Sequence, residues 1–440
     1  SSAEEQNFLY RSLNLRQKEI FYDIIRKVQL NIPIRIMIMG EAGTGKSRLL
    51  QAINMWVDHY YSNMRSNDPN SAYALICAYT GNAAFNSGGM TFHSALGMKI
   101  NSNLSEESVF GLISDKRLQQ LIDTFANIKF LSADEFSYIG AHMNTKINKH
   151  LKTIKQTTSD YGGLDTVFYG DPRQLGPMFD DWIFEPDKKH PCGPIVGDYL
   201  FKSFHSFTLN EIMRQDDKQY INALNDLSDV SSPMKAENVR LFKQRQIEEK
   251  NINFLPNFRV DYFQENKDVD SHNLETLNKL ETVQYNVEAK ITLLGDANNN
   301  VKKTLLRKIK DDNNPKATMG LLLRLPLKIG ARYFIPTNIC ISDGMVNGAI
   351  GTLKEIDFSS KNQPLTLWVK FDNDKVGVDA RSRLKNGTKY KTRCDQGWTP
   401  VTKITKQFPT SRIKIFGIIN QFPLALGYSF TIAKAQVIIT

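Results

Sequence analysis

A glycine-rich octapeptide between an apolar run and a helical pattern constrains the fold more than any other feature of the sequence. Residues 40–47 read GEAGTGKS and fit the pattern G-x-x-x-x-G-K-[ST] at every position. The apolar run 34–39 precedes it, and the helical pattern 47–60 follows it. Backbone N–H groups of such a loop, with the positive end of the next helix, bind phosphate. The sequence therefore predicts a phosphate-binding loop in an α/β fold.

Each part of this loop has an expected role. Gly43 and Gly45 allow the backbone to turn its N–H groups toward the phosphates, and Thr44 lies between them. Lys46 would neutralise the β and γ phosphates of ATP, and Ser47 would hold Mg²⁺. The alternative is a glycine-rich turn without a ligand, which the flanking strand and helix patterns disfavour.

Three further apolar runs are typical of buried strands: residues 73–78, 128–133 and 166–169. Each runs into a polar or glycine-containing turn, and helical patterns lie between them. Repeated strand–turn–helix units predict a parallel sheet with helices on both faces. The chemistry is then expected at the carboxyl ends of the strands.

Two acidic residues and two later motifs supply candidate catalytic groups. Asp134 and Glu135 follow an apolar strand, so Asp134 is expected to bind the Mg²⁺ shell and Glu135 to deprotonate the attacking water. Gln174, in GDPRQLGP, is placed to contact the γ-phosphate or its water. Arg214, in LNEIMRQ, is a candidate for stabilising the transferring phosphoryl group from a second domain. Surface charges or a turn without a role are the alternatives.

A segment of small residues, hydroxyls and aromatic rings follows the run 73–78. It suits close approach to a sugar-phosphate backbone, with stacking on bases. Core packing is the alternative for Phe85 and Phe92. The residues expected to contact nucleic acid here are Thr80, Gly81, Phe85, Thr91, His93 and Ser94.

Charge and cysteine content narrow the class of protein. The chain has 440 residues, and 56 Lys plus Arg against 46 Asp plus Glu give a net charge of +10, which suits a polyanionic partner. The four cysteines form no CxxC pair, so neither a zinc site nor a disulfide framework is expected. The protein is expected in a reducing compartment. No apolar run has the length of a membrane span.

After about residue 320 the pattern changes to short strands with turn signals. Residues 325–336, 348–358, 365–371 and 375–380 each predict a strand of a small all-β module. Residues 379–393 are dense in Lys and Arg, which is typical of a solvated loop or of a binding segment.

Taken in order, the motifs resemble those of superfamily-one DNA helicases of the petite-integration-frequency (PIF) type. The segments that carry the resemblance are LNLRQ, GEAGTGKS, TGNAAFNSGGMTFHSALG, ADE, GDPRQLGP, LNEIMRQ, KDVDSHN, GMVNGAIGTL and FPLALGYSFTIAKAQ. They occur in the order of the family and cover nearly the whole chain. In LNLRQ the family glutamine that reads adenine corresponds to Gln17.

The resemblance implies an α/β fold with two RecA-like P-loop motor domains that bind ATP between them. It also implies a small wedge insertion near 97–120 and an inserted SH3-like β module. The expected domains are residues 1–205 for motor domain one, 206–315 for the first part of motor domain two, 316–407 for the β module, and 408–440 for a truncated return segment of motor domain two.

The resemblance further implies an ATP-dependent DNA helicase with ATP and Mg²⁺ as cofactors, acting in DNA replication, repair and recombination. Its expected partners are single-stranded DNA and duplex junctions, with 5′ to 3′ movement by a monomeric motor. Asn347, Thr431 and Lys434 are the implied DNA contacts in the later motifs. The protein is expected to be intracellular, in the nucleus or mitochondrion of a eukaryote and otherwise in the cytoplasm, and no membrane is involved.

The sequence departs from the family pattern at two places. Ala433 and Ala435 flank Lys434 where the family has His and Ser, so weaker DNA contact is expected there. The final family motif, with a second catalytic arginine, is expected beyond Thr440. The alternatives to a DNA helicase are an RNA helicase of the same superfamily, a small-molecule P-loop kinase, and a truncated non-catalytic DNA-binding fragment.

Overall fold

The structure is a computed structural model in which the chain forms two compact units, residues 1–255 and 256–440. The structure describes residues 3–64, 72–98, 115–178, 180–188, 199–213, 217–228, 232–246, 260–295, 298–312, 314–315, 317–385, 390–410, 415–432 and 434–435.

A six-stranded, wholly parallel sheet forms the centre of the first unit, with strand order β3-β2-β4-β5-β1-β6. Its strands are β1 (Arg35–Gly40), β2 (Ala74–Ala78), β3 (Met90–Thr91), β4 (Phe130–Asp134), β5 (Asp165–Gly170) and β6 (His205–Leu209). The strand expected before the phosphate loop and the three further apolar runs are confirmed. The short strands β3 and β6 were not expected, because neither has a continuous apolar run.

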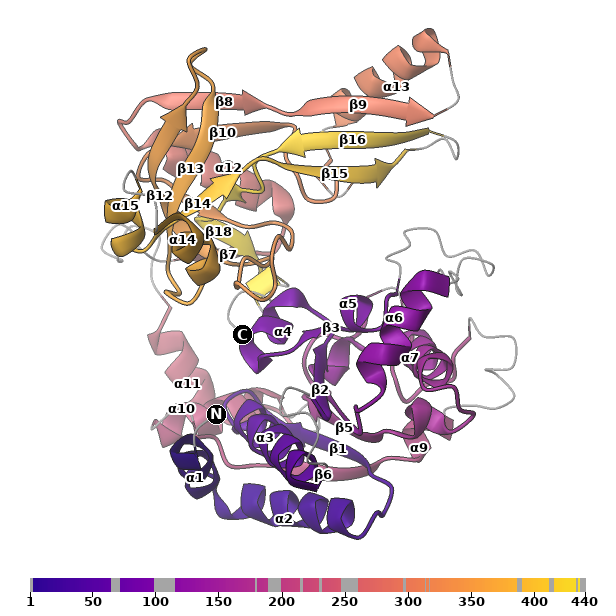
Figure 1. Cartoon of the computed structure of the whole chain (residues 1–440). Helices are drawn as coiled ribbons and strands as arrows, with labels where there is room; N and C mark the ends of the chain where they lie inside the picture. The colour runs from indigo at the N-terminus through magenta and orange to yellow at the C-terminus, as the bar shows by residue number, and fades with distance from the viewer. Residues whose placement is uncertain are drawn as a thin grey trace. The chain divides into compact units, whose positions relative to one another are not determined.

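Helices cover both faces of this sheet (Figure 1). The helices of the first unit are α1 (Ala3–Arg11), α2 (Leu15–Gln29), α3 (Lys46–Met64), α4 (Gly81–Ser87), α5 (Phe92–Ala95), α6 (Asp115–Phe125), α7 (Ala141–Ile154), α9 (Tyr199–Lys202), α10 (Lys218–Ser228) and α11 (Ala236–Gln244). Ile36 and Ile38 pack with α2 and α3 on one face, whereas Met37 packs with α6 and α7 on the other. This alternation follows from the two-residue period of a strand.

Helix α2 has one apolar side. Ile20, Ile24 and Val28 of α2 are all buried in the core under the sheet. The helix starts at a capping box, in which the Asn14 side chain accepts from the N–H of Gln17 and the Gln17 side chain accepts from the N–H of Asn14. This cap fixes the position of Gln17 relative to the helix.

The boundary expected at 205/206 does not divide the structure. Strand β6 pairs with β1 from Ile36↔His205 to Gly40↔Leu209, so the residues after 205 complete the first sheet. The first unit then continues through α10 and α11. Of the wedge expected near 97–120, residues 99–114 lie outside the described residues, and residues 115–120 form the first half of α6.

The second unit is rich in short strands. A five-stranded antiparallel sheet has the order β14-β13-β12-β11-β17, and smaller sheets pair β10 with β8, β15 and β9 with β16, and β18 with β7. The strands are β7 (Asp261–Phe263), β8 (Gln284–Glu288), β9 (Lys290–Gly295), β10 (Arg324–Lys328), β11 (Arg332–Phe334), β12 (Ile350–Phe358), β13 (Pro364–Phe371), β14 (Trp398–Thr402), β15 (Ile404–Pro409), β16 (Ile415–Gln421), β17 (Ala425–Leu426) and β18 (Ser429–Thr431). Because β17 joins the largest sheet, that sheet draws on both sides of the boundary expected at 407/408.

Four helices accompany these strands: α12 (Asn266–Asn278), α13 (Asn299–Asp312), α14 (Val378–Lys385) and α15 (Lys391–Asp395). The strand expected at 375–380 is wrong, because a turn and the start of α14 occupy those residues. The short strands expected at 325–336, 348–358 and 365–371 are present.

The basic segment 379–393 also differs from a solvated loop in its described part. Arg381 donates to the carbonyl of Val376 and to the Thr399 hydroxyl, at 2.6 and 2.7 Å. Arg393 pairs with Asp357 at 2.9 Å and also with Glu355. These two guanidinium groups hold the β module together and are not free cations. None of the helices in the described ranges is long and apolar enough to cross a membrane.

Candidate functional site

The phosphate loop connects the end of β1 to the start of α3, as its pattern predicts. Gly43 and Gly45 have φ of 87° and 79°, in the left-handed region that glycine adopts without strain. A Cβ at Gly40 would lie 2.7 Å from the Thr44 hydroxyl oxygen and 2.8 Å from the Leu209 carbonyl oxygen. The close packing of the loop against β6 therefore requires glycine at position 40.

Lys46 lies folded over its own loop. Its ammonium donates to the carbonyl oxygens of Gly40 and Glu41, at 2.6 and 2.9 Å. The Thr44 hydroxyl also donates to Glu41 O, at 2.8 Å. Phosphate oxygens carry full charge and are stronger partners for an ammonium than neutral carbonyls. The arrangement keeps Lys46 at the loop, where a bound triphosphate would replace the carbonyls.

Asp134 and Glu135 lie at the carboxyl end of β4, two strands from β1 in the same sheet. Burial raises the pKa of Asp134 to about 6, and nearby Lys46 opposes the shift. Burial and the charge of Asp134 raise the pKa of Glu135 to about 7. A carboxyl group with a pKa near neutrality suits a general base, because it is partly ionised and still basic.

The oxygen donors present fit a Mg²⁺ ion bound together with a nucleotide. Ser47 is exposed in the first turn of α3, and Asp134 is buried at the end of β4. Within the described ranges, no group of three or more His, Cys, Asp or Glu forms a closed metal site. Mg²⁺ commonly takes one or two protein oxygens and completes its shell with phosphate and water.

The motif GDPRQLGP begins beside the loop, because β5 pairs with β1 and Met39 lies opposite Gly170. Arg173 forms an ion pair with Glu41 (Nη1–Oε1, 2.7 Å), and its Nε lies 3.3 Å from Asp171 Oδ1. Gln174 is half-buried in the same turn, and its N–H donates to the carbonyl of Asp171. Gln174 was predicted from the motif, whereas Arg173 was not; its positive charge, opposite to that of Glu41, was the available signal.

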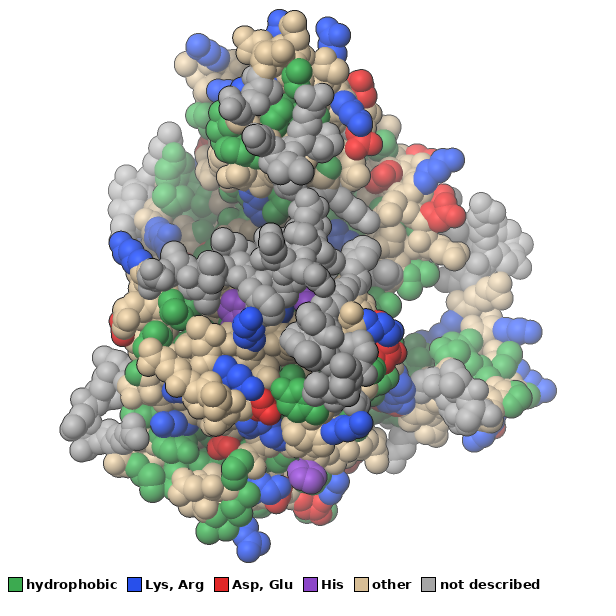
Figure 2. All heavy atoms as spheres, turned by 90° about the vertical axis from the view of Figure 1, so that its right-hand side faces the viewer, with side chains coloured by type: hydrophobic (Ala, Val, Ile, Leu, Met, Phe, Trp, Pro, Cys, Tyr) green, Lys and Arg blue, Asp and Glu red, His purple; other side chains and the backbone are tan. Residues whose placement is uncertain are grey.

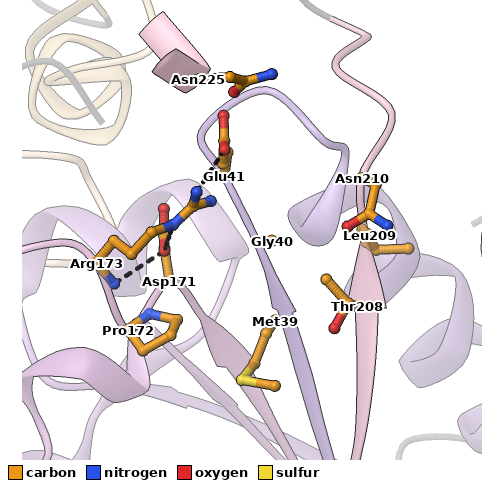
Figure 3. Close-up of a pocket in the computed structure, with 10 residues that line it drawn as sticks. All are labelled: Met39, Gly40, Glu41, Asp171, Pro172, Arg173, Thr208, Leu209, Asn210 and Asn225. Atoms are coloured by element: carbon orange, nitrogen blue, oxygen red, sulfur yellow. Dashed lines mark hydrogen bonds and ion pairs between the residues drawn. The ribbon is translucent and has the colours of Figure 1, made fainter. Parts of the chain in front are cut away.

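A hollow of about 390 Å³ lies beside the loop (Figure 3). It is lined by Met39, Gly40, Glu41, Asp171, Pro172, Arg173, Thr208, Leu209, Asn210 and Asn225. Figure 3 shows the Arg173 guanidinium directed at the Glu41 carboxylate, with Asn225 of α10 on the far side of that carboxylate. With its amide nitrogen turned toward the acid, Asn225 donates to Glu41 Oε2 and Oε1 at 2.7 and 2.9 Å. The hollow is thus bordered by the carboxyl ends of three strands.

Gln17 is buried against the loop. Its Nε2 donates to the carbonyls of Thr44 and Gly45, at 3.0 and 3.4 Å, and its Oε1 accepts from the N–H of Asn14 at 2.9 Å. The carboxamide therefore connects the N-cap of α2 to the backbone of the phosphate loop. Its expected contact with adenine stays a prediction.

The six residues expected to contact nucleic acid in the first unit lie together after β2 and β3. The Thr80 hydroxyl caps α4 by accepting from Ala83 N, and the Thr91 hydroxyl caps α5 by accepting from Ser94 N. Phe92 is fully buried, so core packing is confirmed for it. Burial, reinforced by nearby Lys146, lowers the pKa of His93.

The other residues expected to contact DNA lie in the second unit. Lys434 is placed over two aromatic rings, 3.6 Å from the centroid of Phe334 and 5.5 Å from that of Phe430, and burial lowers its pKa to about 8. The N–H of Asn347 donates to Asn338 Oδ1 at 2.8 Å, and Thr431 ends β18. Arg214 lies outside the described residues.

Positive charge does not by itself mark an interface on the face that Figure 2 shows. Among the coloured side chains of that face, Lys and Arg are dispersed between acidic, polar and apolar groups.

Several known proteins are similar to this chain in sequence. A family model described as PIF1-like helicase matches residues 12–238. The chain is 30% identical over 212 residues to the ATP-dependent DNA helicase PIF1 of Candida albicans (46% of this chain, 21% of the relative) and 28% identical over 351 residues to that of Danio rerio (79% and 48%). It is 23% identical over 427 residues to Pif1 of Campylobacter jejuni (91% and 80%). The chain thus spans about half, or less, of the length of the first two relatives.

Solved structures show the same fold. The crystal structure of Pif1 helicase from Candida albicans matches with a TM-score of 0.64 and 21% identity, over 96% of this chain and 86% of the other. Bacteroides Pif1 in complex with ADP-AlF3 and ssDNA matches with a TM-score of 0.60 and 19% identity, over 96% and 84%. The expected α/β fold with a parallel central sheet is confirmed, and it matches the RecA-like fold of Pif1 helicases. Since the family model covers just over half of the sequence, the chain belongs to the PIF1-like helicase family.

Proposed function

We propose that this chain is the motor of an ATP-dependent DNA helicase that moves along single-stranded DNA and opens duplexes. The observation that carries the proposal is the placement of Lys46 and Glu135 at the same edge of one parallel sheet. A cation for phosphate and a carboxyl group with a pKa of about 7 are the two groups that hydrolysis of a triphosphate needs.

Hydrolysis follows from the residues at this edge. Lys46 exchanges the carbonyls of Gly40 and Glu41 for the β and γ phosphates, while the N–H groups of Gly43, Thr44 and Gly45 bind the phosphate oxygens. The Glu135 carboxylate accepts a proton from water as the water oxygen bonds to the γ-phosphorus, and the bond from that phosphorus to the β-phosphate oxygen breaks. Mg²⁺, held by Ser47 and Asp134, would supply Lewis-acid charge to the phosphates.

Three further groups complete this proposal. Gln174 orients the attacking water from its turn after β5, and Arg214 stabilises charge on the transferring phosphoryl group. Gln17 contributes to adenine selection from its place beside the loop. The nearness of GDPRQLGP to the phosphate loop, through the β1–β5 pairing, supports the role of Gln174.

The DNA path is proposed from the segment after β2 and β3, with later contacts from the second unit. Thr80, Gly81, Phe85, Thr91, His93 and Ser94 form the first group, and Asn347, Thr431 and Lys434 form the second. Small residues and hydroxyls at strand ends suit a sugar-phosphate backbone. The relatives are named DNA helicases, and one matched Bacteroides Pif1 structure is described as bound to ssDNA.

Partners and place in the cell follow from that substrate. We propose single-stranded DNA and duplex junctions as partners, and a motor that acts as a monomer. We also propose that the five-stranded sheet belongs to an SH3-like β module and that a wedge lies near residues 97–120. A matched structure is described as two coordinating Pif1 helicases at forked dsDNA. The proposed compartment is one that holds DNA: nucleus or mitochondrion in a eukaryote, cytoplasm in a bacterium.

Two measurements on the purified protein test the proposal. The first compares ATP hydrolysis with single-stranded DNA and with RNA of equal length and sequence; we expect stimulation by DNA. The second follows displacement of a labelled strand from duplexes with a 5′ or a 3′ tail; we expect unwinding from the 5′ tail. Glu135→Gln serves as the catalytically inactive control. Stimulation by RNA alone would identify an RNA helicase, and phosphate transfer to a metabolite without nucleic acid would identify a kinase.

A further inference from the structure

One hydroxyl group connects the proposed catalytic base with the segment proposed to contact DNA. The Thr80 hydroxyl donates to Glu135 Oε2 at 3.1 Å. The Thr80 hydroxyl oxygen also accepts a hydrogen bond from the N–H of Ala83 at 3.2 Å, and it thereby caps the N-terminus of α4. Thr80 therefore has one contact that is structural and a second that reaches the nucleotide site.

The sheet brings these two residues together. Strands β2 and β4 are neighbours in parallel, with Ala78 opposite Asp134, so the chain leaves both strands at the same edge. Glu135 follows with a φ of 54°, in the left-handed region that glutamate rarely adopts. Such a backbone conformation persists only where the surrounding contacts hold it. The N–H of Glu135 also donates to Asp134 Oδ1 at 3.0 Å, which fixes the turn further.

A hydroxyl group has a single proton to donate. In the structure Thr80 gives that proton to Glu135, and its acceptor site is used by Ala83. A phosphate oxygen of a DNA strand at Thr80 needs the same proton, because phosphate oxygens only accept. Binding of the strand at Thr80 and the hydrogen bond to Glu135 therefore exclude one another.

We propose that Thr80 is a positioning residue. Its hydroxyl group holds the Glu135 carboxylate away from the attacking water until single-stranded DNA binds and accepts the hydrogen bond from Thr80 in place of Glu135. The inference rests on the proposed function, since it requires ATP hydrolysis that responds to DNA. Without DNA, Glu135 stays bound to Thr80 and is restrained from turning toward the attacking water. With DNA, the carboxylate is released and acts as the base. Strand binding at the edge of β2 thus controls hydrolysis at the edge of β4.

The test compares three variants of Thr80. Thr80→Val has nearly the same shape but no hydroxyl, so it loses both the cap and the contact with Glu135. Thr80→Ser keeps both. Thr80→Asp keeps an acceptor for the cap but has no proton for Glu135 when it is ionised. Melting temperatures of all three show whether the first unit remains folded, and Thr153→Val removes a helix-surface hydroxyl in α7 as a control for hydroxyl loss.

The rate of ATP hydrolysis is measured without DNA and with saturating single-stranded oligothymidylate. We expect Thr80→Val to raise the DNA-free kcat about fivefold, the factor that one hydrogen bond typically represents, with little change in the KM for ATP. The ratio of DNA-stimulated to DNA-free kcat then falls by the same factor. Thr80→Asp also raises the DNA-free kcat, because its carboxylate has no proton for Glu135 and repels it. Thr80→Ser keeps the wild-type ratio of DNA-stimulated to DNA-free kcat, and Thr153→Val leaves both rates unchanged.

Thr80→Asp gives the readout that loss of a cap does not move, because its carboxylate retains an acceptor for the cap and has no proton for Glu135.

Two results overturn the inference while leaving the proposed function intact. One is a DNA-free rate in Thr80→Val equal to that of the wild type, together with a lower DNA-stimulated rate, which makes Thr80 a DNA contact only. The other is a rate increase in Thr80→Val that is absent in Thr80→Asp, which assigns the effect to the cap. Wild-type hydrolysis that does not respond to DNA overturns the proposed function and the inference together.

Discussion

Arg173 and Glu41 form an ion pair between the turn after β5 and the second residue of the phosphate loop, with Nη1 and Oε1 2.7 Å apart (Figure 3). Asp171 holds the same guanidinium through Nε, and the Asn225 carboxamide lies beside the same carboxylate, to which it donates when its amide nitrogen is turned toward the acid. The pair therefore places one positive and one negative charge at the border of the hollow beside the loop. Neutralising either partner changes the charge that an incoming triphosphate meets.

Glu41→Gln and Arg173→Gln are expected to shift nucleotide affinity in opposite directions. Glu41→Gln removes one negative charge beside Arg173, which keeps its contact with Asp171, so ATP binds about two- to fivefold more tightly. Arg173→Gln removes the positive charge beside Glu41, so ATP binds more weakly by a similar factor. Fluorescence titration with a labelled ATP analogue, at two salt concentrations, measures both. Arg324→Gln removes an exposed ion pair with Glu288 in the second unit and serves as the control. Shifts of the same sign in both variants contradict the prediction.

The parallel sheet and the phosphate loop were predictable because their signals are local. A buried parallel strand is a continuous apolar run, and the loop needs glycine at positions that the sequence shows directly. Strand β6 was not predicted, because it has no continuous apolar run and only Leu209 of its five residues is buried. Its pairing with β1 is a tertiary contact that the sequence pattern does not carry.

The identities of the site residues could be predicted from the sequence, but most of the contacts between them could not. Lys46, Asp134 and Glu135 were identified from their motifs, and the structure brings them to one edge of the sheet. The contacts of Arg173 with Glu41 and of Thr80 with Glu135 were not identified. Each joins segments more than 50 residues apart, as the separation of 55 between Thr80 and Glu135 shows, so neither follows from spacing.

Glu135→Gln is expected to retain nucleotide and DNA binding but to lose ATP turnover by a factor of about 10² to 10⁴, the usual contribution of a general base. The amide keeps the size of the side chain and can still accept from Thr80, but it cannot take a proton from water. Rates from phosphate release, together with filter binding of labelled ATP and DNA, separate turnover from binding. Glu185→Gln, a half-buried acid that pairs with Lys188 in the same unit, is the control. Normal hydrolysis by Glu135→Gln would show that another group is the base.

The pH dependence of the stability of the nucleotide-free protein measures the ionisation of the Glu135 carboxyl group. Folding raises the pKa of Glu135 from its ordinary value of 4.5 to about 7, so the folded state binds more protons between these values. The contribution of Glu135 to stability is therefore fully present below pH 4.5 and is lost as the pH rises through 7. Glu135→Gln cannot ionise, so it should exceed the wild type in stability at pH 8 by about 2 kcal/mol and by little at pH 4. Urea midpoints followed by circular dichroism at both pH values measure this difference, and a constant difference refutes it.

Gln17 allows adenine recognition to be separated from support of the loop. In Gln17→Leu the carbonyl of Thr44 and the N–H of Asn14 lose their partners, which should cost about 1–3 kcal/mol of stability. If the side chain also reads adenine, the affinity for ATP falls relative to that for GTP; if it only supports the loop, both affinities fall equally. Competition of ATP and GTP for a labelled nucleotide distinguishes the two. Gln119→Leu, on the exposed side of α6, is the control.

Lys434 tests whether the late motif binds DNA phosphate. Its ammonium lies over Phe334 and Phe430, and burial lowers its pKa to about 8, so it is largely charged at neutral pH. Lys434→Met keeps an unbranched side chain over the rings and removes the charge. If Lys434 leaves the rings to bind a phosphate, the slope of log affinity for single-stranded DNA against log salt concentration becomes smaller by about 0.7, the value for one phosphate contact on a single strand. We expect this reduction, measured by fluorescence anisotropy between low and moderate salt, with Lys361→Met on an exposed turn as the control. A slope equal to that of the wild type means that the aromatic contact persists in the DNA complex and that Lys434 stabilises the second unit instead.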